Sequence, residues 1–415
     1  MKIILLTSNY PYGKGESFIL PELPYLLNSH APEIIAVNAH DEAARSKDVE
    51  DGIRYSKLFE RRFSPLAKIM YSVRCVFSKT FHAEITMLRR QKRMNGAVLR
   101  ELLAFQARGE RIFRALAKRF QKELRTNPSR LVLYSYWMVD SAYAIAKLRQ
   151  KYGCKAFSRA HGGDLYEDRH RLGYAPMRSY LFQNLNAVYT VSRGGRDYLT
   201  NKYGYADRIH CSYLGTSNIS GIREINSRSV FRVVTCAYIV KLKRIPLFVE
   251  ALSLITDKAI EWIHFGDGPE RESVIEAIKH LPPNIRYELK GNTPHDEILA
   301  YYKDNDVHLF VNTSSSEGLP VSIMEAISFG VPVIATDVGG TNEIVQNCVN
   351  GYLVSEDITA SELAEVILKV MNAPNVEYEI LRKNAFSFWN ECFNAEKNYQ
   401  LFYEELLGKG GVLNG

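Results

Sequence analysis

Several features are absent from the 415-residue sequence, and each absence excludes a class of protein. No apolar stretch reaches about 18 residues, so a transmembrane helix is not expected. The six cysteines are scattered and form no C-x-x-C pair, which excludes a zinc knuckle, a thioredoxin-type motif and a disulfide-stapled mini-protein. Scattered thiols fit a reducing compartment, so we expect a cytoplasmic protein.

The apolar run at the N-terminus, residues 3–6, is only four residues long, because the polar residues Thr7-Ser8-Asn9 end it. It is too short for the apolar segment of a signal peptide. That run predicts the first strand of a buried sheet. The loop behind it, residues 9–18, has neither the P-loop pattern nor G-x-G-x-x-G. A P-loop enzyme is therefore excluded at this position, and a nicotinamide-dependent enzyme loses its main support.

The dominant pattern is a short β-rich run followed by a helical stretch, repeated in two series. Alternation of this kind predicts parallel sheets covered by helices, and two series in a chain of this length predict two doubly wound α/β domains. The expected strands are 3–7, 33–38, 131–135, 155–159, 187–191 and 209–213, then 232–237, 261–266, 285–289, 307–311, 332–335 and 351–354. Ligands of such sheets bind at the carboxyl ends of the strands.

Charge is divided unequally between the two halves of the chain. Residues 1–220 carry 36 basic and 19 acidic residues, whereas residues 221–415 carry 17 and 27. The basic excess is densest in residues 61–130, with 18 basic and 4 acidic residues. The split predicts two domains with different partners.

The strongest local motif runs from Ser314 to Glu325, after the expected strand 307–311. Pro320 suits the first turn of a helix, which places Glu317 in the preceding loop and Glu325 on the helix. A helix N-terminus at the carboxyl end of a strand attracts phosphate. Two carboxylates beside it can accept hydrogen bonds from sugar hydroxyls. The alternative is a surface loop glutamate and a solvated helix glutamate.

The segment 314–343, with its E-x7-E spacing from Glu317 to Glu325, closely resembles the signature of the family 4 retaining glycosyltransferases, also called glycosyl transferases group 1. The resemblance implies the GT-B fold, in which two Rossmann-like domains face across a cleft. It also implies that Glu325 binds the ribose of a nucleotide and that Glu317 contacts the donor sugar. The backbone amides of Gly318 and Leu319 would then meet the sugar or phosphate.

A second motif, residues 236–244, follows the first strand of the second series and ends in Lys243-Arg244. Two cations at the carboxyl edge of a sheet can neutralise a diphosphate. Lys243 matches the lysine of the family's G-R-L-x-x-x-K-G segment, whereas Tyr238 stands where many members have arginine. We therefore expect Arg244 to supply the second cation. The alternative is an exposed basic helix start.

In the first half, His161 ends the strand 155–159 and precedes two glycines, which would let a ligand approach the backbone. The run His161–Asp164 resembles the family's H-G-x-D motif, whose histidine contacts the donor sugar. The loop after the first strand, with Gly13, Gly15 and Glu16, is expected to close on the donor. A structural histidine and a plain β-to-α turn are the respective alternatives.

Two weaker segments resemble family segments that line the donor, and they contribute Gly266 and the run Lys290-Gly291-Asn292. We expect an acceptor-side Rossmann-like domain over 1–217, with a basic helical insert at about 60–128. A nucleotide-sugar domain is expected over 218–391. A last helix in 392–415 should cross back to the first domain.

The basic insert combines cationic runs, at 89–93 and 111–130, with apolar Ile112, Phe113, Leu116 and Phe120. We interpret this pattern as an amphipathic face for the anionic cytoplasmic side of a membrane. The alternative is a solvated basic helix face. Charge alone also permits nucleic-acid binding, but the sequence has no recognisable nucleic-acid module, and none is expected to bind.

Together these motifs predict a retaining glycosyltransferase that moves a sugar from a nucleoside diphosphate, for which UDP is the choice from family frequency, to a hydroxyl acceptor. The acceptor class expected is a bacterial surface polysaccharide or glycolipid. No cofactor and no metal are expected, because cations and a helix dipole can stabilise the departing diphosphate. The run Asp304-Asn305-Asp306 precedes a strand and is interpreted as a turn. A non-catalytic GT-B subunit and a nucleotide-sugar epimerase are the rival interpretations.

Overall fold

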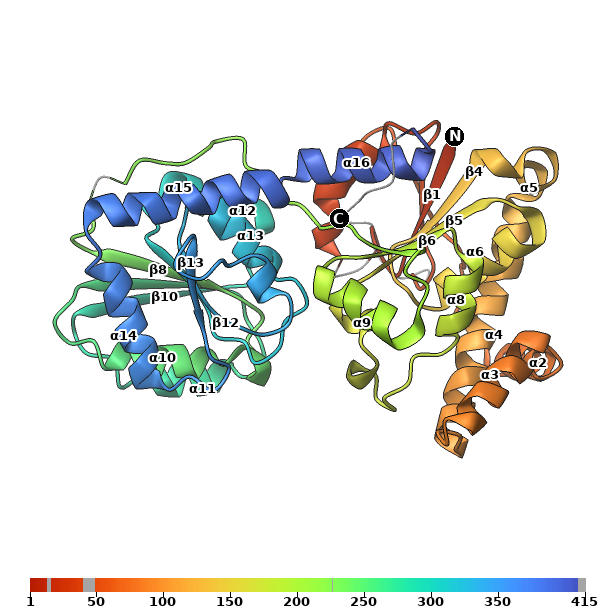
Figure 1. Ribbon diagram of the computed structural model, residues 1–415, viewed down its shortest axis with the longest axis horizontal. Helices are drawn as coiled ribbons and strands as arrows, with labels where there is room; N and C mark the ends of the chain where they lie inside the picture. The colour runs from red at the N-terminus through yellow and green to blue at the C-terminus, as the bar shows by residue number, and fades with distance from the viewer. Residues whose placement is uncertain (13–15, 40–48, 226, 410–415) are drawn as a thin grey trace. The chain divides into compact units, whose positions relative to one another are not determined.

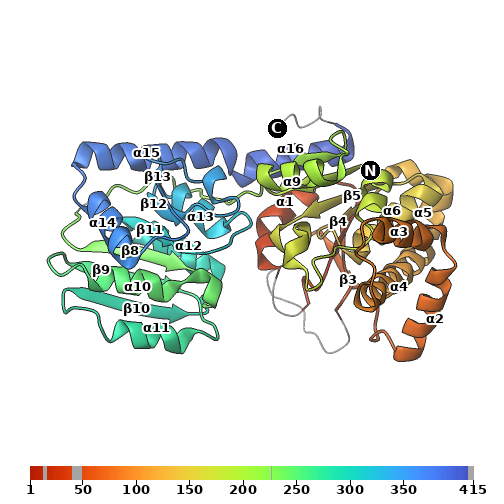
Figure 2. The same ribbon diagram turned by 60° about the horizontal axis from the view of Figure 1, so that its bottom comes forward.

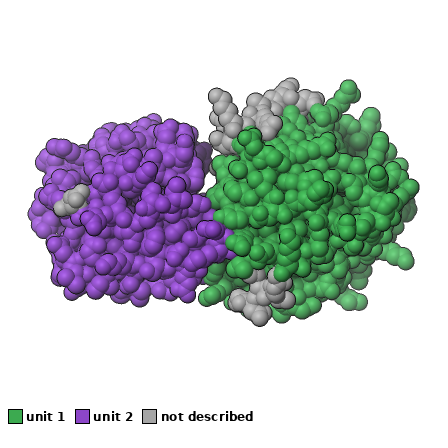
Figure 3. All heavy atoms as spheres, turned by 90° about the horizontal axis from the view of Figure 1, so that it is seen from above, with its two compact units in different colours: residues 1–213, 399–415 green, residues 214–398 purple. Residues whose placement is uncertain are grey.

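The computed structural model describes residues 1–12, 16–39, 49–225 and 227–409, and it divides into two compact units (Figures 1 and 3). Unit 1 comprises 1–213 and 399–415, and unit 2 comprises 214–398. The first division lies four residues before the expected one at 217/218. The second lies seven residues after the expected one at 391/392.

Unit 1 is built on a seven-stranded parallel sheet in the order β3-β2-β1-β4-β5-β6-β7. Its strands are β1 (Lys2–Thr7), β2 (Glu33–Ala36), β3 (Arg54–Lys57), β4 (Leu131–Ser135), β5 (Lys155–Ala160), β6 (Ala187–Thr190) and β7 (Ile209–Cys211). Apolar runs with almost no exposed residue form the central strands, as parallel sheets covered on both faces require.

The helices of unit 1 fill the connections between these strands (Figures 1 and 2). They are α1 (Leu23–Leu26), α2 (Pro65–Val76), α3 (Lys79–Arg90), α4 (Gly96–Arg119), α5 (Gln121–Thr126), α6 (Asp140–Tyr152), α7 (Gly162–Leu165), α8 (Arg178–Asn184) and α9 (Arg193–Tyr203), with 3-10 turns η1 (Ser17–Glu22), η2 (Pro128–Arg130) and η3 (Glu167–Arg169). The insert between β3 and β4 is helical, as expected.

The apolar face of that insert does not lie on the surface. Ile112, Phe113, Leu116 and Phe120 are between 0% and 8% exposed and belong to the core of unit 1. The interpretation of these four residues as a membrane-facing stripe is therefore wrong. They are spaced along α4 and its end so that they pack against the sheet side of the unit, and α6 contacts the same helix.

Unit 2 is built on a six-stranded parallel sheet in the order β10-β9-β8-β11-β12-β13. Its elements are β8 (Phe231–Cys236), η4 (Lys241–Lys243), α10 (Ile245–Ser253), β9 (Ile260–Phe265), α11 (Arg271–Ile278), β10 (Ile285–Gly291), α12 (His295–Asp304), β11 (Leu309–Asn312), α13 (Val321–Ser328), β12 (Val333–Thr336), η5 (Thr341–Glu343), β13 (Gly351–Val354), α14 (Ala360–Met371) and α15 (Asn375–Cys392).

In each sheet the order in which the chain adds strands reverses at one place. This reversal point lies between β1 and β4 in unit 1 and between β8 and β11 in unit 2. The expected pair of doubly wound parallel-sheet domains is confirmed. A reversal of this kind opens a crevice at the carboxyl ends of the two strands, which is where open α/β sheets bind ligands. The candidate site is therefore sought in the loops after these four strands.

The last helix, α16 (Ala395–Leu407), begins in unit 2 and ends in unit 1. Inside unit 1, Tyr403 donates a 2.9 Å hydrogen bond from its hydroxyl to Glu22, which also pairs with Arg159 at 2.8 Å. The Glu22 and Arg159 side chains are both 0% exposed. The Arg159 guanidinium also lies 4.1 Å from the centre of the Phe402 ring. Residues from both ends of the chain thus share one buried charged cluster.

Candidate functional site

The reversal point of unit 2 brings Lys243 and Glu317 together from the loops after β8 and β11. The Lys243 ammonium lies 2.6 Å from Glu317 Oε1, and the two side chains are 21% and 9% exposed. Asn312 and Ser314 donate to the same carboxylate oxygen, at 3.1 and 2.6 Å. An anionic carboxylate and a cation are therefore held in contact at the place where the fold opens a crevice.

One further loop, after β12, fixes the position of Glu317. Gly339 has φ of 55°, and a Cβ there would lie 2.1 Å from the carbonyl oxygen of Glu317. A Cβ at Gly340 would lie 2.5 Å from the carbonyl of Gly318, to which the Gly340 amide donates at 2.8 Å. Only glycine permits this close approach. The two glycines were not among the expected site residues, although their pairing after a strand is the signal that could have revealed them.

Arg244 does not contact Glu317 in this structure. Its guanidinium donates to three backbone carbonyls: Nε to Thr313 at 2.6 Å, Nη2 to Ser314 at 3.4 Å, and Nη1 to Glu356. Thr313 in turn donates its hydroxyl to the carbonyls of Lys243 and Arg244. Arg244 therefore ties the loops after β8 and β11 together, and the expected second cation for a diphosphate is engaged with backbone.

Glu325 lies on α13 and is 6% exposed. Its partner is His295 at the start of α12, with the ring Nε2 2.7 Å from Glu325 Oε1. The hydrogen bond and the charge of Glu325 raise the pKa of His295 above its usual value of 6.5, against the opposing effect of burial. His295 was not among the residues expected from the sequence. It lies three residues after the expected segment Lys290-Gly291-Asn292.

The remaining expected residues of unit 2 lie in the loops after β9 and β11 and at the end of the edge strand β10. A Cβ at Gly266 would lie 1.9 Å from the carbonyl oxygen of Ala237, so this glycine lets the loop after β9 contact the loop after β8. Gly318 is partly buried and Leu319 is buried, directly before α13. Lys290 pairs with Glu288 at 2.8 Å on the edge strand β10, and it is followed by Gly291 and the exposed Asn292.

In unit 1, His161 follows β5 and is 7% exposed. Among the described residues neither of its ring nitrogens has a hydrogen-bond partner. Burial lowers the pKa of His161 well below its usual value, with a smaller contribution from Arg159, so the imidazole is neutral. Its ring centre lies 4.6 Å from that of Trp137. His161 is thus a buried imidazole whose ring nitrogens have no hydrogen-bond partner among the described residues.

The Glu16 side chain accepts hydrogen bonds that stabilise the start of the loop after β1. Its carboxylate accepts backbone N–H groups of Ser8, Asn9 and Tyr10 at 3.0, 2.6 and 2.7 Å, and the Trp137 indole N–H at 2.5 Å. It thus joins the loops after β1 and β4 at the reversal point of unit 1. The expected donor-binding Gly13 and Gly15 lie outside the described residues.

Within the described part of the chain, no three histidine, cysteine, aspartate or glutamate side chains converge as metal ligands would. Asp306, from the D-x-D run, forms an ion pair with Arg223 Nε at 2.9 Å. A search of the described helices also finds none that combines the length and apolarity needed to cross a membrane.

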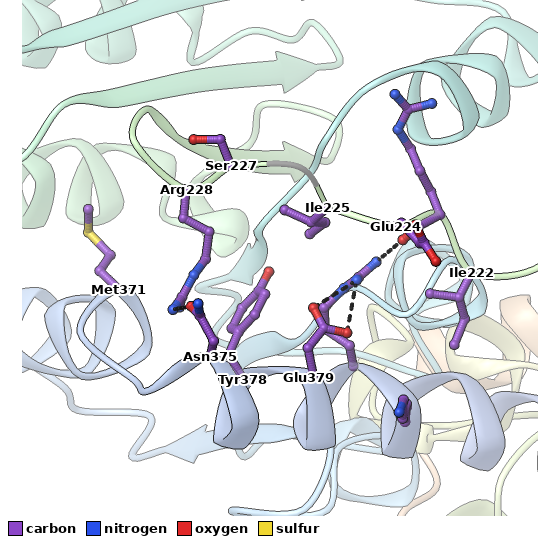
Figure 4. A pocket seen from close by; sticks show the side chains of 12 residues that line it. Ile222, Glu224, Ile225, Ser227, Arg228, Met371, Asn375, Tyr378 and Glu379 are labelled. Carbon is purple, nitrogen blue, oxygen red and sulfur yellow. Dashed lines mark hydrogen bonds and ion pairs between the residues drawn. The ribbon is translucent and has the colours of Figure 1, made fainter.

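A pocket of about 710 Å³ occurs elsewhere in unit 2 (Figure 4). It lies between the segment 222–228 and α15, where Arg382 reaches Glu379 at 3.1 Å and also donates to the carbonyl of Arg223. This segment leads into the amino end of β8 at Phe231. Because ligands of doubly wound sheets bind at the carboxyl ends of the strands, this pocket is not the candidate site.

The His295–Glu325 pair predicts a pH-dependent contribution to stability. A histidine with a raised pKa stabilises the folded state below its unfolded value near 6.5, and the contribution is lost as pH rises through the folded value. We expect the melting temperature of wild type to exceed that of His295→Gln at about pH 6. The difference between the two melting temperatures should disappear at about pH 9.

Proton NMR titration of the His295 ring provides the direct check of this prediction. The pKa should lie above 6.5 in wild type and fall toward it in Glu325→Gln. His30, an exposed histidine of unit 1, serves as the internal control that should not respond. A melting gap that is equal at both pH values would contradict the assignment.

Comparison with known proteins adds to this geometry. Residues 223–388 match the family model described as glycosyl transferases group 1. The GtfA subunit of the UDP-N-acetylglucosamine–peptide N-acetylglucosaminyltransferase of Streptococcus agalactiae is 28% identical over 197 residues, 45% of this chain and 37% of that protein. The amylovoran biosynthesis glycosyltransferase AmsK of Erwinia amylovora is 26% identical over 145 residues, 34% of this chain and 35% of that protein. The matches therefore span little more than a third of these relatives.

Among solved structures, Anabaena HepE in complex with UDP and glucose superposes with a TM-score of 0.66. The sequence identity is 16%, and the alignment covers 98% of this chain and 100% of HepE. A likeness at this identity shows the fold, and with the two parallel sheets it establishes the GT-B fold.

Proposed function

We propose that the chain transfers a sugar from a nucleoside diphosphate to a hydroxyl acceptor with retention at the anomeric carbon, since it has the GT-B fold and its residues 223–388 match the family model of the glycosyl transferases group 1. The observation that carries the proposal is the contact of Lys243 with Glu317 at the reversal point of unit 2, with Glu325 on the adjoining helix.

Each residue then has a role that its surroundings support. Glu325 binds the ribose hydroxyls, which would compete with His295 for the same carboxylate. Glu317 accepts from hydroxyls of the donor sugar, and the amides of Gly318 and Leu319 meet the sugar or the phosphate. Lys243 stabilises charge on the departing diphosphate, and no cofactor or metal is required for that step. Arg244 acts as a positioning residue through the loop at 313–314.

In unit 1, we assign His161 to the donor sugar, because its ring nitrogens lack partners among the described residues. Glu16 holds residues 8–10, and Gly13 and Gly15 remain assigned to the donor from the sequence alone. Lys290, Gly291, Asn292 and Gly266 are assigned to the surroundings of the nucleotide. UDP is the proposed nucleotide, since HepE was solved with UDP. A bacterial surface polysaccharide or glycolipid is the proposed acceptor, supported by the name of the Erwinia relative.

A thermal-shift panel of nucleotides and nucleotide sugars tests the site. A ligand at 100 times its dissociation constant should add about 2.7 kcal/mol to the free energy of unfolding, a shift of a few degrees. We expect one nucleotide family to stabilise wild type and Glu325→Ala to lose the response. Glu365→Ala, an exposed glutamate on α14, is the matched control and should respond as wild type does.

The reaction itself separates the proposal from its rivals. A transferase releases free nucleoside diphosphate only when a hydroxyl acceptor is added. An epimerase converts the nucleotide sugar without acceptor, and a non-catalytic subunit binds it without release. Either of the latter results would overturn the proposed activity while leaving the binding site in place.

A further inference from the structure

The outer face of α2 is apolar and exposed. Six of the 18 large hydrophobic side chains exposed in the described structure fall in the 12 residues 66–77. They are Leu66 (81% exposed), Ile69 (62%), Met70 (45%), Val73 (54%), Val76 (38%) and Phe77 (80%). At about 100° per residue, the six lie within an arc of roughly 120°. Single exposed hydrophobics need no explanation, but a contiguous stripe does.

The opposite face of α2 is packed against the rest of unit 1. Ser64 caps the helix by accepting the Ala67 amide at 3.3 Å, and Pro65 occupies its first position. Cys75 is buried, and the Tyr71 ring lies 5.5 Å from the guanidinium of Arg114 on α4. Figures 1 and 2 show α2 at the rim of unit 1 beside α3 and α4. The inner face thus anchors the helix and leaves the apolar stripe exposed.

Basic residues are frequent in the chain around this stripe, between Glu60 and Glu84. Residues 61–83 contain five basic residues and no acidic residue: Arg61, Arg62, Lys68, Arg74 and Lys79. All five are exposed. On α2 itself Arg74 lies next to the stripe, whereas Lys68 projects from the other side of the helix. An exposed apolar stripe in a basic segment is the composition of helices that lie in the plane of an anionic lipid surface.

We propose that α2 docks unit 1 onto an anionic lipid surface, with Leu66, Val73 and Phe77 inserted among the acyl chains and the basic side chains at the headgroups. A second copy of this chain is a poorer occupant. A two-fold contact places the same surface patch on both subunits, which would set the five cations against five identical ones. The docking surface is distinct from the α4 residues that the sequence favoured, which are buried.

Sedimentation with vesicles tests the proposal without nucleotide or acceptor, so its outcome does not depend on the proposed reaction. Wild type should bind vesicles of phosphatidylglycerol mixed with phosphatidylcholine, and salt should weaken the binding. Vesicles of phosphatidylcholine alone should bind far less. Leu66→Ser with Phe77→Ser should lower binding about tenfold or more, because two exposed apolar anchors are lost. Lys68→Glu with Arg74→Glu should do the same through charge.

A matched control comes from unit 2, where Val376 and Ile380 on α15 are 73% and 52% exposed. Val376→Ser with Ile380→Ser should bind as wild type does. Melting temperatures of all variants should stay close to wild type, since every altered side chain is exposed. The proposal is overturned if wild type ignores anionic vesicles, binds both compositions equally, or keeps its binding without Leu66 and Phe77. If wild type binds no vesicles but forms a dimer, and Leu66→Ser with Phe77→Ser dissociates that dimer, then the apolar face of α2 binds a second copy of the chain instead.

Discussion

Replacing Lys243 by alanine lowers kcat for sugar transfer about 100- to 1000-fold, the usual loss when one group that stabilises developing charge is removed. The ammonium is only 21% exposed and lies beside Glu317, so its charge acts in a partly buried site where electrostatic effects are strengthened. Release of nucleoside diphosphate in the presence of acceptor measures the effect.

Two companion variants make this prediction specific. Lys241→Ala removes an exposed cation two residues away and should leave kcat unchanged. Lys243→Arg keeps the charge but changes the geometry from a point charge to a planar fork, so an intermediate kcat is expected. Equal rates for wild type and Lys243→Ala, with Glu317 still in place, would remove Lys243 from the reaction.

Replacing Arg159 by methionine destabilises unit 1 by about 3–5 kcal/mol, because Glu22 is left as an uncompensated buried charge. Both side chains are completely buried, and burial is the largest influence on Glu22, whose pKa it raises. Hydrogen exchange of the β4 and β5 amides reports the free energy of opening of unit 1 separately from unit 2.

The double replacement of Arg159 and Glu22 by methionine provides the decisive comparison. Removing both charges should restore much of the lost stability, since no unpaired buried charge remains. The pair Arg196–Asp197, at 2.9 Å with the two side chains 28% and 57% exposed, is the control: Arg196→Ala should change stability by about 0.5 kcal/mol or less. A double variant as unstable as Arg159→Met would mean that lost packing against Phe402, rather than charge, causes the effect.

The sequence could predict twelve of the thirteen strands, most of which are buried apolar runs whose ends are marked by polar loops. The strand it missed, β3, reads Arg54-Tyr55-Ser56-Lys57 and lies at the edge of the sheet with exposed or half-buried side chains. Such an edge strand has no apolar signature.

The candidate site was predictable to the extent that loops after strands carry it. Glu317, Glu325 and Lys243 were expected site residues because the segments that hold them resemble family motifs, and the structure places Lys243 and Glu317 in loops after β8 and β11 and Glu325 on the helix α13 that follows. The partner of Glu325 was not, since its pairing with His295 joins residues 30 positions apart. Periodicity also could not tell which side of the basic insert faces inward: α4 turns its apolar residues to the core, whereas α2 exposes its own.

The division of unit 1 into two chain segments has a consequence for synthesis. Residues 1–213 leave the ribosome first, but unit 1 is complete only when 399–409 follow, after the whole of unit 2. Until then Arg159 and Glu22 lack Phe402 and Tyr403, which otherwise contact them. The first unit to be translated is thus the last to be finished, and a chain stalled anywhere in unit 2 carries an incomplete unit 1, with a charged core cluster that quality-control proteases and chaperones can reach.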